Sequence, residues 1–489
     1  MHYLVDNLQP ENSYRTILKR IAAFGGVHAL SALIALVRGK LVAMLLGSTG
    51  MGITSLFSSS TGFIQQIAGL GLNQALVKEV APIKGDADKM KVLMSVALRL
   101  ILLTSLGGGA ICFLLSPLLS LWTFGSADYT AGFMFMSICV ALTIASVAYT
   151  GLLQGVGAVK YLVKASVVGG LAGLCFGVPL YYFFGYNGIV PSLTVGALTM
   201  FIFYYTSFRK SGYNLAVKFN WAEHKPLVMR LLKVGTVLMI GSMITSFVGY
   251  VVNVYVKTHG SLSDVGLYNA ANSLTNQYVG LVFSALAMDY FPRLSAALNK
   301  PGEFNAIINR QIEIMSLIIA PMVICLIATA PWIIRLLLTD EFLPVTSLMR
   351  WMGLGIMILA ITYPLSYVFI VKNDSRIYLI MEVLMPAVLW ILTSFLFYHL
   401  WGLVGLGVSF VVRMFVGDSI AYVVLHRVYG VTVSRSNLLR IIFTAIVCSS
   451  AFVASLFENC HWSVFAAILA VSLLFSGISL YRRTKKAQN

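Results

Sequence analysis

Residues 209–231 read RKSGYNLAVKFNWAEHKPLVMRL and form the longest polar connection in the chain. Its five basic residues are Arg209, Lys210, Lys218, Lys225 and Arg230. On both sides the sequence consists of apolar runs of about 20 residues, which is the length that crosses a bilayer as a helix. The connection therefore predicts a hinge between two membrane-embedded halves.

The apolar runs predict an all-α integral membrane protein. Of 489 residues, 59% are hydrophobic and only 10% are charged, with a mean hydropathy of +0.87, whereas a soluble domain carries about 25% charged residues. The first 20 residues are too polar for a signal-peptide core, so we expect them to lead into the first span. We place fourteen spans at 22–47, 52–77, 92–115, 130–151, 162–184, 187–208, 232–256, 266–290, 311–333, 345–371, 377–398, 401–425, 440–457 and 462–481.

The basic residues predict the orientation of the chain. With a cytoplasmic N-terminus, 27 of the 34 Lys and Arg residues fall inside, two (Lys257 and Arg335) fall outside, and five lie within spans. Cytoplasmic loops carry an excess of such residues. We therefore expect the N-terminus, residues 209–231 and the tail YRRTKKAQN to be cytoplasmic. The net charge of +17 reflects this loop pattern rather than nucleic-acid binding.

The two halves resemble each other at a constant offset of 214 residues. Spans two, three and four then overlay spans eight, nine and ten, and Pro117 meets Pro331 at the same predicted outer boundary. We interpret this as a duplication into parallel six-span lobes related by a pseudo-twofold axis. The predicted domains are an N-terminal lobe at 1–208, a linker at 209–231, a C-terminal lobe at 232–427, and two additional helices with a basic tail at 428–489.

Equivalent helices of the two lobes carry polar stripes. In span eight, four side chains fall within about a 100° arc: Asn269, Asn272, Ser273 and Asn276. Their counterparts in span two are Ser55, Ser58, Ser59 and Gly62, and Gln66 continues that face. One stripe alone is typical of helix packing in membranes. Two related stripes favour the walls of a shared hydrated cavity whose amides bind sugar hydroxyls.

Five basic residues lie within spans: Arg38, Lys40, Arg99, Arg350 and Arg413. Cations at membrane depth are costly and usually serve a ligand, a partner or a pathway. Arg413 lies about 16 Å from the cytoplasmic end of its span at 1.5 Å per residue, close to the middle of the membrane. Lys40 and Arg99 are each about 10 Å deep, within reach of the interface. Arg350 is expected to be an interfacial anchor.

Two acidic residues, Glu382 and Asp418, also lie within spans. Each either pairs with a buried arginine or exchanges a coupling ion, a proton or sodium. No carboxylate pair has the spacing of a catalytic dyad. The chain contains no HExxH or GxxxxGK[ST] motif, and five of its six cysteines lie in apolar runs. We therefore expect no enzyme, no metal and no cofactor.

The segments RGKLVAMLLGSTGMGITSLF, VGLYNAANSL and FPRLS resemble the polysaccharide-unit flippases of the Wzx kind, the O-antigen translocases. Their superfamily also contains multidrug antiporters and lipid II flippases. The resemblance implies two six-helix lobes around a central cavity that moves an undecaprenyl-pyrophosphate-linked oligosaccharide to the periplasmic leaflet of the bacterial inner membrane. It places the cationic cavity at Arg38, Lys40, Arg99 and Arg413, and a groove for the lipid tail at the last two spans.

Three classes of function remain open on the sequence alone. A flippase is favoured because the buried cations outnumber the buried carboxylates, and its expected partners are the lipid-linked substrate, the bilayer, a coupling ion, a polysaccharide polymerase and glycosyltransferases. A multidrug or cation antiporter of the same superfamily should instead place carboxylates in its binding lobe. A membrane-embedded glycosyltransferase or polymerase would need a large outer loop, and every predicted outer loop is short.

Overall fold

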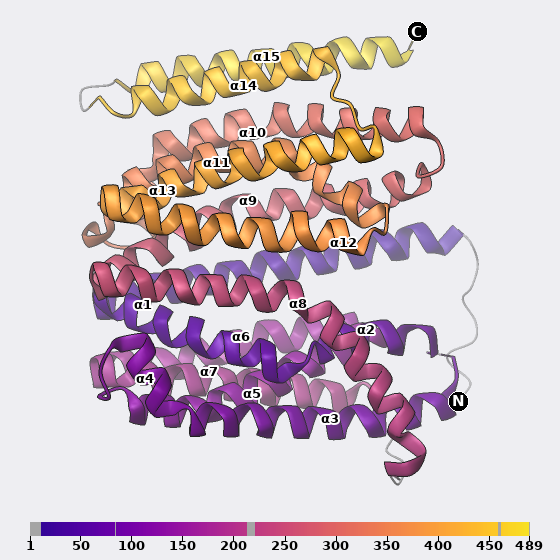
Figure 1. Cartoon of the computed structure of the whole chain (residues 1–489), viewed down its shortest axis with the longest axis vertical. Coiled ribbons are helices and arrows are strands. Elements are labelled where there is room, and N and C mark those ends of the chain that lie inside the picture. Colours follow the sequence, from indigo (N-terminus) through magenta and orange to yellow (C-terminus); the bar gives the residue numbers. More distant parts are fainter. Residues whose placement is uncertain (1–10, 84, 213–220, 458–460, 489) are drawn as a thin grey trace. The chain divides into compact units, whose positions relative to one another are not determined.

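The computed structural model describes residues 11–83, 85–212, 221–457 and 461–488. Residues 1–10 and the middle of the predicted linker, with Lys218, lie outside these ranges. Every regular element described is a helix (Figure 1). The helices are α1 (Glu11–Gly69), α2 (Leu72–Val80), η1 (Ala81–Ile83), α3 (Ala87–Leu114), α4 (Ser116–Phe124), α5 (Thr130–Gly155), α6 (Val159–Phe184), η2 (Gly185–Gly188), α7 (Ile189–Lys210), α8 (Trp221–His259), α9 (Leu262–Ala296), α10 (Pro301–Leu337), η3 (Asp340–Phe342), α11 (Val345–Val371), α12 (Ser375–Tyr378), η4 (Leu379–Leu384), α13 (Met385–Tyr429), α14 (Arg435–Ala454) and α15 (Trp462–Gln488).

The described helices confirm the all-α membrane architecture. Ten stretches are long and apolar enough to cross a membrane, and three of them, Leu30–Gly69, Val159–Lys210 and Ser375–Tyr429, contain two helices each. Counting these halves separately and adding α9 gives the fourteen predicted crossings. Large apolar side chains such as Leu114, 76% exposed, and Phe183, 74% exposed, cover the outside. Apolar surface on this scale is typical of a lipid-facing surface.

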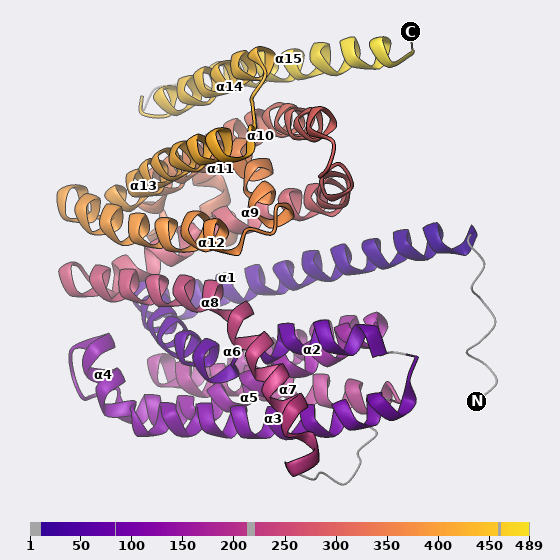
Figure 2. The ribbon, with the colours of Figure 1, turned by 45° about the vertical axis from the view of Figure 1, so that its right-hand side comes forward.

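Two long helices change direction at glycine. In α1 the kink lies at Gly47, with φ 66° and ψ −167°, and Figure 2 shows the two parts of α1 running in different directions. In α13 it lies at Trp401 and Gly402, where Gly402 has φ 56°. Positive φ is accessible to glycine without steric cost. These kinks separate spans one and two, and spans eleven and twelve, without a loop.

Several element boundaries differ from the predicted spans. The span predicted at 52–77 is broken, because α1 ends at Gly69 and α2 begins at Leu72, with Leu70 (φ 46°) and Gly71 (φ 60°) between them. The predicted linker is partly helical, since α7 runs to Lys210 and α8 begins at Trp221. The polar residues that flank an apolar run can still be helical, because helix propensity does not depend on hydropathy. Hydropathy alone therefore misplaces the ends of these helices.

The chain packs into two compact units, Met1–Thr258 and His259–Asn489. In the first, a hydrophobic core of buried residues from α2, α3 and α5–α8 includes Leu76, Met94 and Phe208. In the second, α9–α11, α13 and α14 share a core that includes Tyr290, Ile327 and Phe369. Packing thus places α8 in the first unit. The predicted lobes are divided by the sequence repeat instead, which makes α8 the first helix of the second lobe. This division into lobes stays a prediction.

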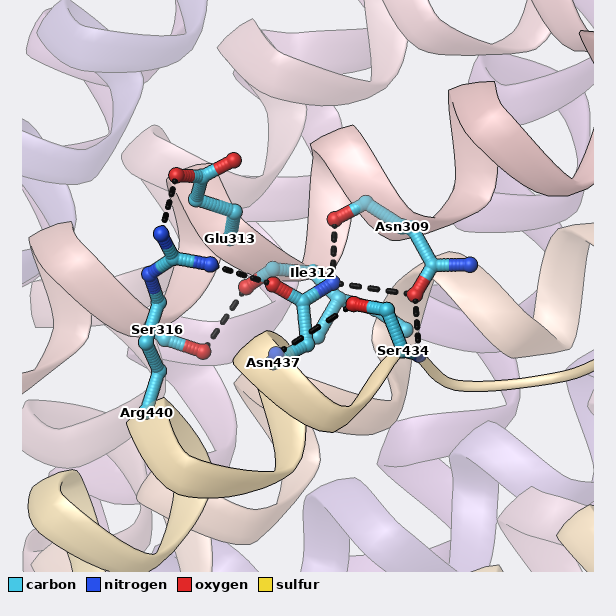
Figure 3. A network of polar contacts seen from close by, with 7 residues as sticks. All are labelled: Asn309, Ile312, Glu313, Ser316, Ser434, Asn437 and Arg440. Carbon is cyan, nitrogen blue, oxygen red and sulfur yellow. Dashed lines mark hydrogen bonds and ion pairs between the residues drawn. The ribbon is translucent and has the colours of Figure 1, made fainter. Parts of the chain in front are cut away.

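A polar network joins α14 to α10 in the second unit (Figure 3). Arg440 Nη2 lies 2.9 Å from the buried carboxylate of Glu313, and Arg440 Nη1 donates to Asn437 Oδ1 at 2.9 Å. Asn437 Nδ2 donates to the Asn309 carbonyl at 2.7 Å. A buried ion pair depends on both partners, because removing one leaves an uncompensated charge. The first of the two additional helices is therefore fixed to the body of its unit, and α15 runs beside it (Figures 1 and 2).

Candidate functional site

Arg38 lies inside the N-terminal unit. It belongs to the first half of α1, is partly buried, and its Nη2 donates to the Tyr181 hydroxyl of α6 at 3.4 Å. A Cβ added at Gly196 of α7 would lie 3.9 Å from Arg38 Nη1. The guanidinium thus points from α1 toward α6 and α7, at a place where α7 has no side chain.

Arg413 of α13 lies between aromatic rings in the C-terminal unit. Its guanidinium carbon is 4.7 Å from the centre of the Trp390 ring and 5.0 Å from that of Phe410. Such cation–π contacts are worth about 0.5–2 kcal/mol each. Arg413 Nε is buried and has no hydrogen-bond partner among the described residues. The rings stabilise the charge but leave hydrogen-bond donors available.

The two arginines occupy corresponding places in the repeat. Across the fifth and sixth spans of each half, the offset becomes 217 residues, and Tyr181, Gly185, Gly188, Ser192 and Gly196 meet Tyr398, Gly402, Gly405, Ser409 and Arg413. The first four pairs are identical. At the same offset Gly173 meets Trp390, and the Cβ position of Gly173 lies 3.3 Å from Gly196 Cα. Gly196 therefore leaves room beside Arg38, whereas Arg413 and Trp390 stand at the positions of the C-terminal unit that match Gly196 and Gly173.

Glu382 and Asp418 are both held by hydroxyl groups of α11. Thr362 Oγ1 lies 2.6 Å from Asp418 Oδ2, and Ser366, one turn further along α11, donates to Glu382 of η4. Within the described residues, no ion pair joins either carboxylate to Arg413, although Asp418 is close enough to interact with Arg413 electrostatically. The alternative in which these carboxylates neutralise that arginine by direct pairing is therefore not what the structure shows.

The remaining basic residues of the spans lie elsewhere. Lys40 is partly buried in α1, and Arg99 is exposed on α3. Arg350, predicted as an interfacial anchor, donates through Nη1 to the Ser455 carbonyl at 2.8 Å. That contact ties α11 to the C-terminal end of α14, so Arg350 has a structural partner. Lys257, one of the two basic residues predicted to lie outside, donates to the Phe124 carbonyl.

The polar stripes are partly self-bonded. On α9, Asn276 Nδ2 donates to Asn272 Oδ1 at 2.8 Å, and Asn269 Nδ2 donates to the Val265 carbonyl at 2.8 Å. On α1, Ser58 is exposed and Ser55 partly buried. Ser59 Oγ donates to the Leu56 carbonyl, and Gln66 Oε1 accepts from Ser242 of α8 at 3.2 Å. Each stripe is described within its own unit, so a shared cavity stays a prediction.

Sequence reasoning missed the residues that surround the charges. Tyr181, Trp390, Thr362 and Ser366 are single polar or aromatic residues in apolar helices, where nothing local distinguishes them. The repeat could have identified one of them, because Tyr181 and Tyr398 match at the 217-residue offset. The others contact the charges across helices that are distant in sequence.

Comparisons with known proteins agree with this architecture. The sequence profile of the family described as polysaccharide biosynthesis protein matches residues 41–347. The lipid III flippase of Escherichia coli (strain K12) is 22% identical over 356 residues, covering 71% of this chain and 83% of that protein.

Two solved structures show the same fold. The lipid II flippase MurJ in an inward closed conformation gives a TM-score of 0.72 at 15% identity, covering 96% of this chain and 99% of that one. An inward-facing multidrug resistance MATE family transporter of the MOP superfamily gives 0.67 at 17% identity, covering 85% and 95%. The family match extends over more than half of the sequence and confirms the resemblance. The chain belongs to the polysaccharide biosynthesis protein family, with the fold shared by MurJ and the MATE transporters of the MOP superfamily.

Proposed function

We propose that the protein is a flippase that moves an undecaprenyl-pyrophosphate-linked oligosaccharide, such as an O-antigen unit, from the cytoplasmic to the periplasmic leaflet of the bacterial inner membrane. Membership of a polysaccharide biosynthesis family supports this, as do a relative that is a lipid III flippase and a fold shared with a lipid II flippase. The transport step breaks no covalent bond. The expected partners of the protein are the glycosyltransferases that make the glycan and the polymerase that uses it.

Arg413 carries the proposal. A charged arginine at the centre of a membrane helix costs about 2.5–3.5 kcal/mol, and a buried unpaired donor costs about 1–3 kcal/mol more. Arg413 has aromatic neighbours but no carboxylate at ion-pair distance among the described residues. A pyrophosphate supplies negative charge and acceptors in direct contact, since a guanidinium matches phosphate oxygens in a bidentate geometry.

The other predicted residues supply the rest of the pathway in this proposal. Arg38 is the corresponding cation of the N-terminal unit, and Lys40 and Arg99 add positive charge along the route. The amides of α9 and the serines of α1 bind sugar hydroxyls. A head group of this kind cannot cross hydrocarbon unaided because its polar groups would lose their water. Alternating access moves the head group, while α14 and α15 hold the lipid tail.

We assign ion coupling to Glu382 and Asp418. The two side chains are close enough to interact electrostatically, and each is held by a hydroxyl of α11. Binding or release of a proton or sodium ion would change the charge of this pair. That change would favour one of the two packing arrangements of the surrounding helices over the other. Asp418→Asn should abolish the dependence of transport on an imposed ion gradient while substrate binding persists.

A multidrug or cation antiporter is the second candidate. The same two carboxylates favour it, because a cationic drug needs negative charge in its site, and the fold is shared with MATE transporters. Gene deletion in cells distinguishes the two functions. Deletion of an antiporter gene sensitises cells to cationic drugs without loss of surface glycan, and deletion of a flippase gene does the reverse.

The test replaces Arg413 in the full-length protein and measures surface glycan together with membrane abundance. We expect Arg413→Gln to reduce export at least tenfold at normal abundance, because the charge is lost. Arg413→Lys should retain partial activity, because it keeps charge but loses the bidentate fork. Arg335→Gln is the matched control, since Arg335 is exposed and forms an ion pair with exposed Asp340.

The competing structural role makes a different prediction. If Arg413 served to neutralise Asp418, Arg413→Gln would lower protein abundance, and Arg413→Gln/Asp418→Asn would restore it. Normal glycan export from a stable Arg413→Gln protein would remove Arg413 from the site and remove the main support for the proposal.

A further inference from the structure

A cavity of about 160 Å³ lies within the N-terminal unit, between the second half of α1, the start of α2, α5 and α8. Its polar lining consists of four carboxamides and two hydroxyls: Gln65, Gln66, Asn73, Gln74, Thr143 and Ser242. The rest of the lining consists of glycines and apolar side chains, which include Leu72, Ile144 and Val147. No lining residue carries a charge. The cavity is thus large enough for several waters at ~30 Å³ each, or for one sugar ring.

The lining holds unused hydrogen-bonding capacity. The Ser242 hydroxyl donates to Gln66 Oε1 at 3.2 Å, which orients this carboxamide. Asn73 Oδ1 has no hydrogen-bond partner among the described residues and is buried next to Gly151 of α5. Gln65 and Gln74 likewise form no hydrogen bond with another described side chain or backbone group. Gln65 is partly buried and Gln74 is exposed, so their carboxamides are free to donate to and accept from a ligand in the cavity.

Close backbone packing builds the walls. A Cβ added at Gly71, where φ is +60°, would lie closer than 3.0 Å to the Gly235 carbonyl of α8, and one at Gly235 would meet the Leu70 carbonyl in the same way. Gly151 of α5 packs equally tightly against Asn73. The loop between α1 and α2 is therefore held against α8, and the start of α2 is held against α5. The lining side chains are positioned by contacts that are independent of any ligand.

This lining matches an uncharged sugar. Carboxamides donate and accept at the same time, as hydroxyl and acetamido groups do, and the apolar wall suits the C–H face of a pyranose. A phosphate would need a cation, and a cationic drug would need a carboxylate or aromatic cage. We propose that this cavity binds an uncharged sugar of the N-acetylhexosamine class in the lipid-linked head group. This rests on the proposed flippase function.

The position of the cavity fits an entry site. Gln74 lies one turn before Lys78 on α2, and Lys78 belongs to the predicted cytoplasmic side. Ser242 lies about 18 Å along α8 from Arg230 at 1.5 Å per residue. The cavity therefore extends from the predicted cytoplasmic side toward the middle of the membrane, the depth predicted for Arg413.

The test measures binding of two defined lipids to the purified full-length protein. The probes are undecaprenyl pyrophosphate and the same lipid carrying one N-acetylglucosamine. We expect the unmodified protein to bind the glycosylated lipid at least tenfold more tightly. Gln65→Leu and Asn73→Leu should each reduce that ratio at least threefold, and Gln154→Leu, an exposed amide of α5 outside the cavity, should leave it unchanged.

The outcomes separate the subsite from the flippase proposal. Gln65 makes no hydrogen bond with a described group, so Gln65→Leu should remain folded even if Asn73→Leu does not. An equal affinity of the unmodified protein for both lipids, or an unchanged ratio in a folded Gln65→Leu protein, would contradict the sugar site alone. Failure to bind either lipid would contradict the flippase proposal as well.

Discussion

At the residue scale, the two deep arginines reach corresponding places by different routes. Arg413 stands on the sixth span of its half, whereas Arg38 projects from the first span into the space left by Gly196, the residue that matches Arg413. What the repeat preserves is the location of the positive charge rather than the residue that supplies it. This is expected if the charge itself binds substrate in both units.

Moving the charge within the N-terminal unit tests this equivalence. Arg38→Ala should reduce glycan export at least tenfold. Arg38→Ala/Gly196→Arg should recover a substantial part, because the new guanidinium starts where Arg413 stands in the other unit and Arg38 Nη1 is the nearest atom, at 3.9 Å, to a Cβ at 196. Surface glycan normalised to membrane abundance is the measurement.

The matched control for that experiment is Arg38→Ala/Gly196→Ala, which adds a side chain without charge. We expect it to export no better than Arg38→Ala. If the arginine variant were no better than this control at equal abundance, a charge at position 196 would not replace the charge of Arg38. The proposed equivalence of Arg38 and Arg413 would then be wrong.

How far the sequence predicts the site depends on the kind of residue. Arg38, Arg413, Glu382 and Asp418 could be selected because a charge in an apolar run is energetically exceptional. Their partners could not be selected, because Trp390 or Thr362 is ordinary in a membrane helix and becomes meaningful only through a contact between helices. The pairing of arginine with carboxylate was an alternative that only coordinates could decide.

At the element scale, both units use the same turn between their fifth and sixth spans. Gly185 and Gly402 have nearly equal dihedrals, φ 55°, ψ −130° and φ 56°, ψ −136°. Three residues later, a Cβ at Gly188 or Gly405 would lie closer than 3.0 Å to the carbonyl of Leu180 or Phe397. A Gly-x-x-Gly turn thus allows two membrane helices to fold back on each other with direct backbone contact.

Alanine at these contacts should damage the turn. Gly188→Ala and Gly405→Ala each force backbone to move, so we expect a loss of about 2 kcal/mol or more, within the range of severe backbone effects. Gly62→Ala is the matched control, because nothing lies within 4 Å of its Cβ position. Thermal denaturation of the purified variants measures the difference. Equal melting temperatures for Gly405→Ala and Gly62→Ala would show that the turn tolerates a side chain.

The sequence predicts the number and order of these elements better than their ends. Apolar runs of membrane length are unambiguous, which is why fourteen crossings are recovered. The break at Leu70–Gly71 and the joining of α1 across Gly47 leave no trace in hydropathy. Both depend on the dihedrals that a glycine or its neighbour adopts once the helices pack.

At the scale of the whole molecule, the distribution of basic residues predicts one orientation. The strong excess of basic residues in the predicted inner loops should keep the N-terminus, the 209–231 segment and the tail in the cytoplasm. Reporter fusions after residues 125, 260 and 460 should report the periplasm. A cytoplasmic signal from any of the three fusions would overturn the span count or the orientation.

The central claim is that the protein carries a pyrophosphate-linked glycan across a bilayer. Its most direct test reconstitutes the purified full-length protein in vesicles with undecaprenyl-pyrophosphoryl N-acetylglucosamine on the inner leaflet. An impermeant galactosyltransferase added outside then reports each molecule that arrives there. We predict exposure at least tenfold faster than in empty vesicles, and a return to the empty-vesicle rate for Arg413→Gln. Equal rates with and without the protein, or an undiminished rate for Arg413→Gln, would contradict the account.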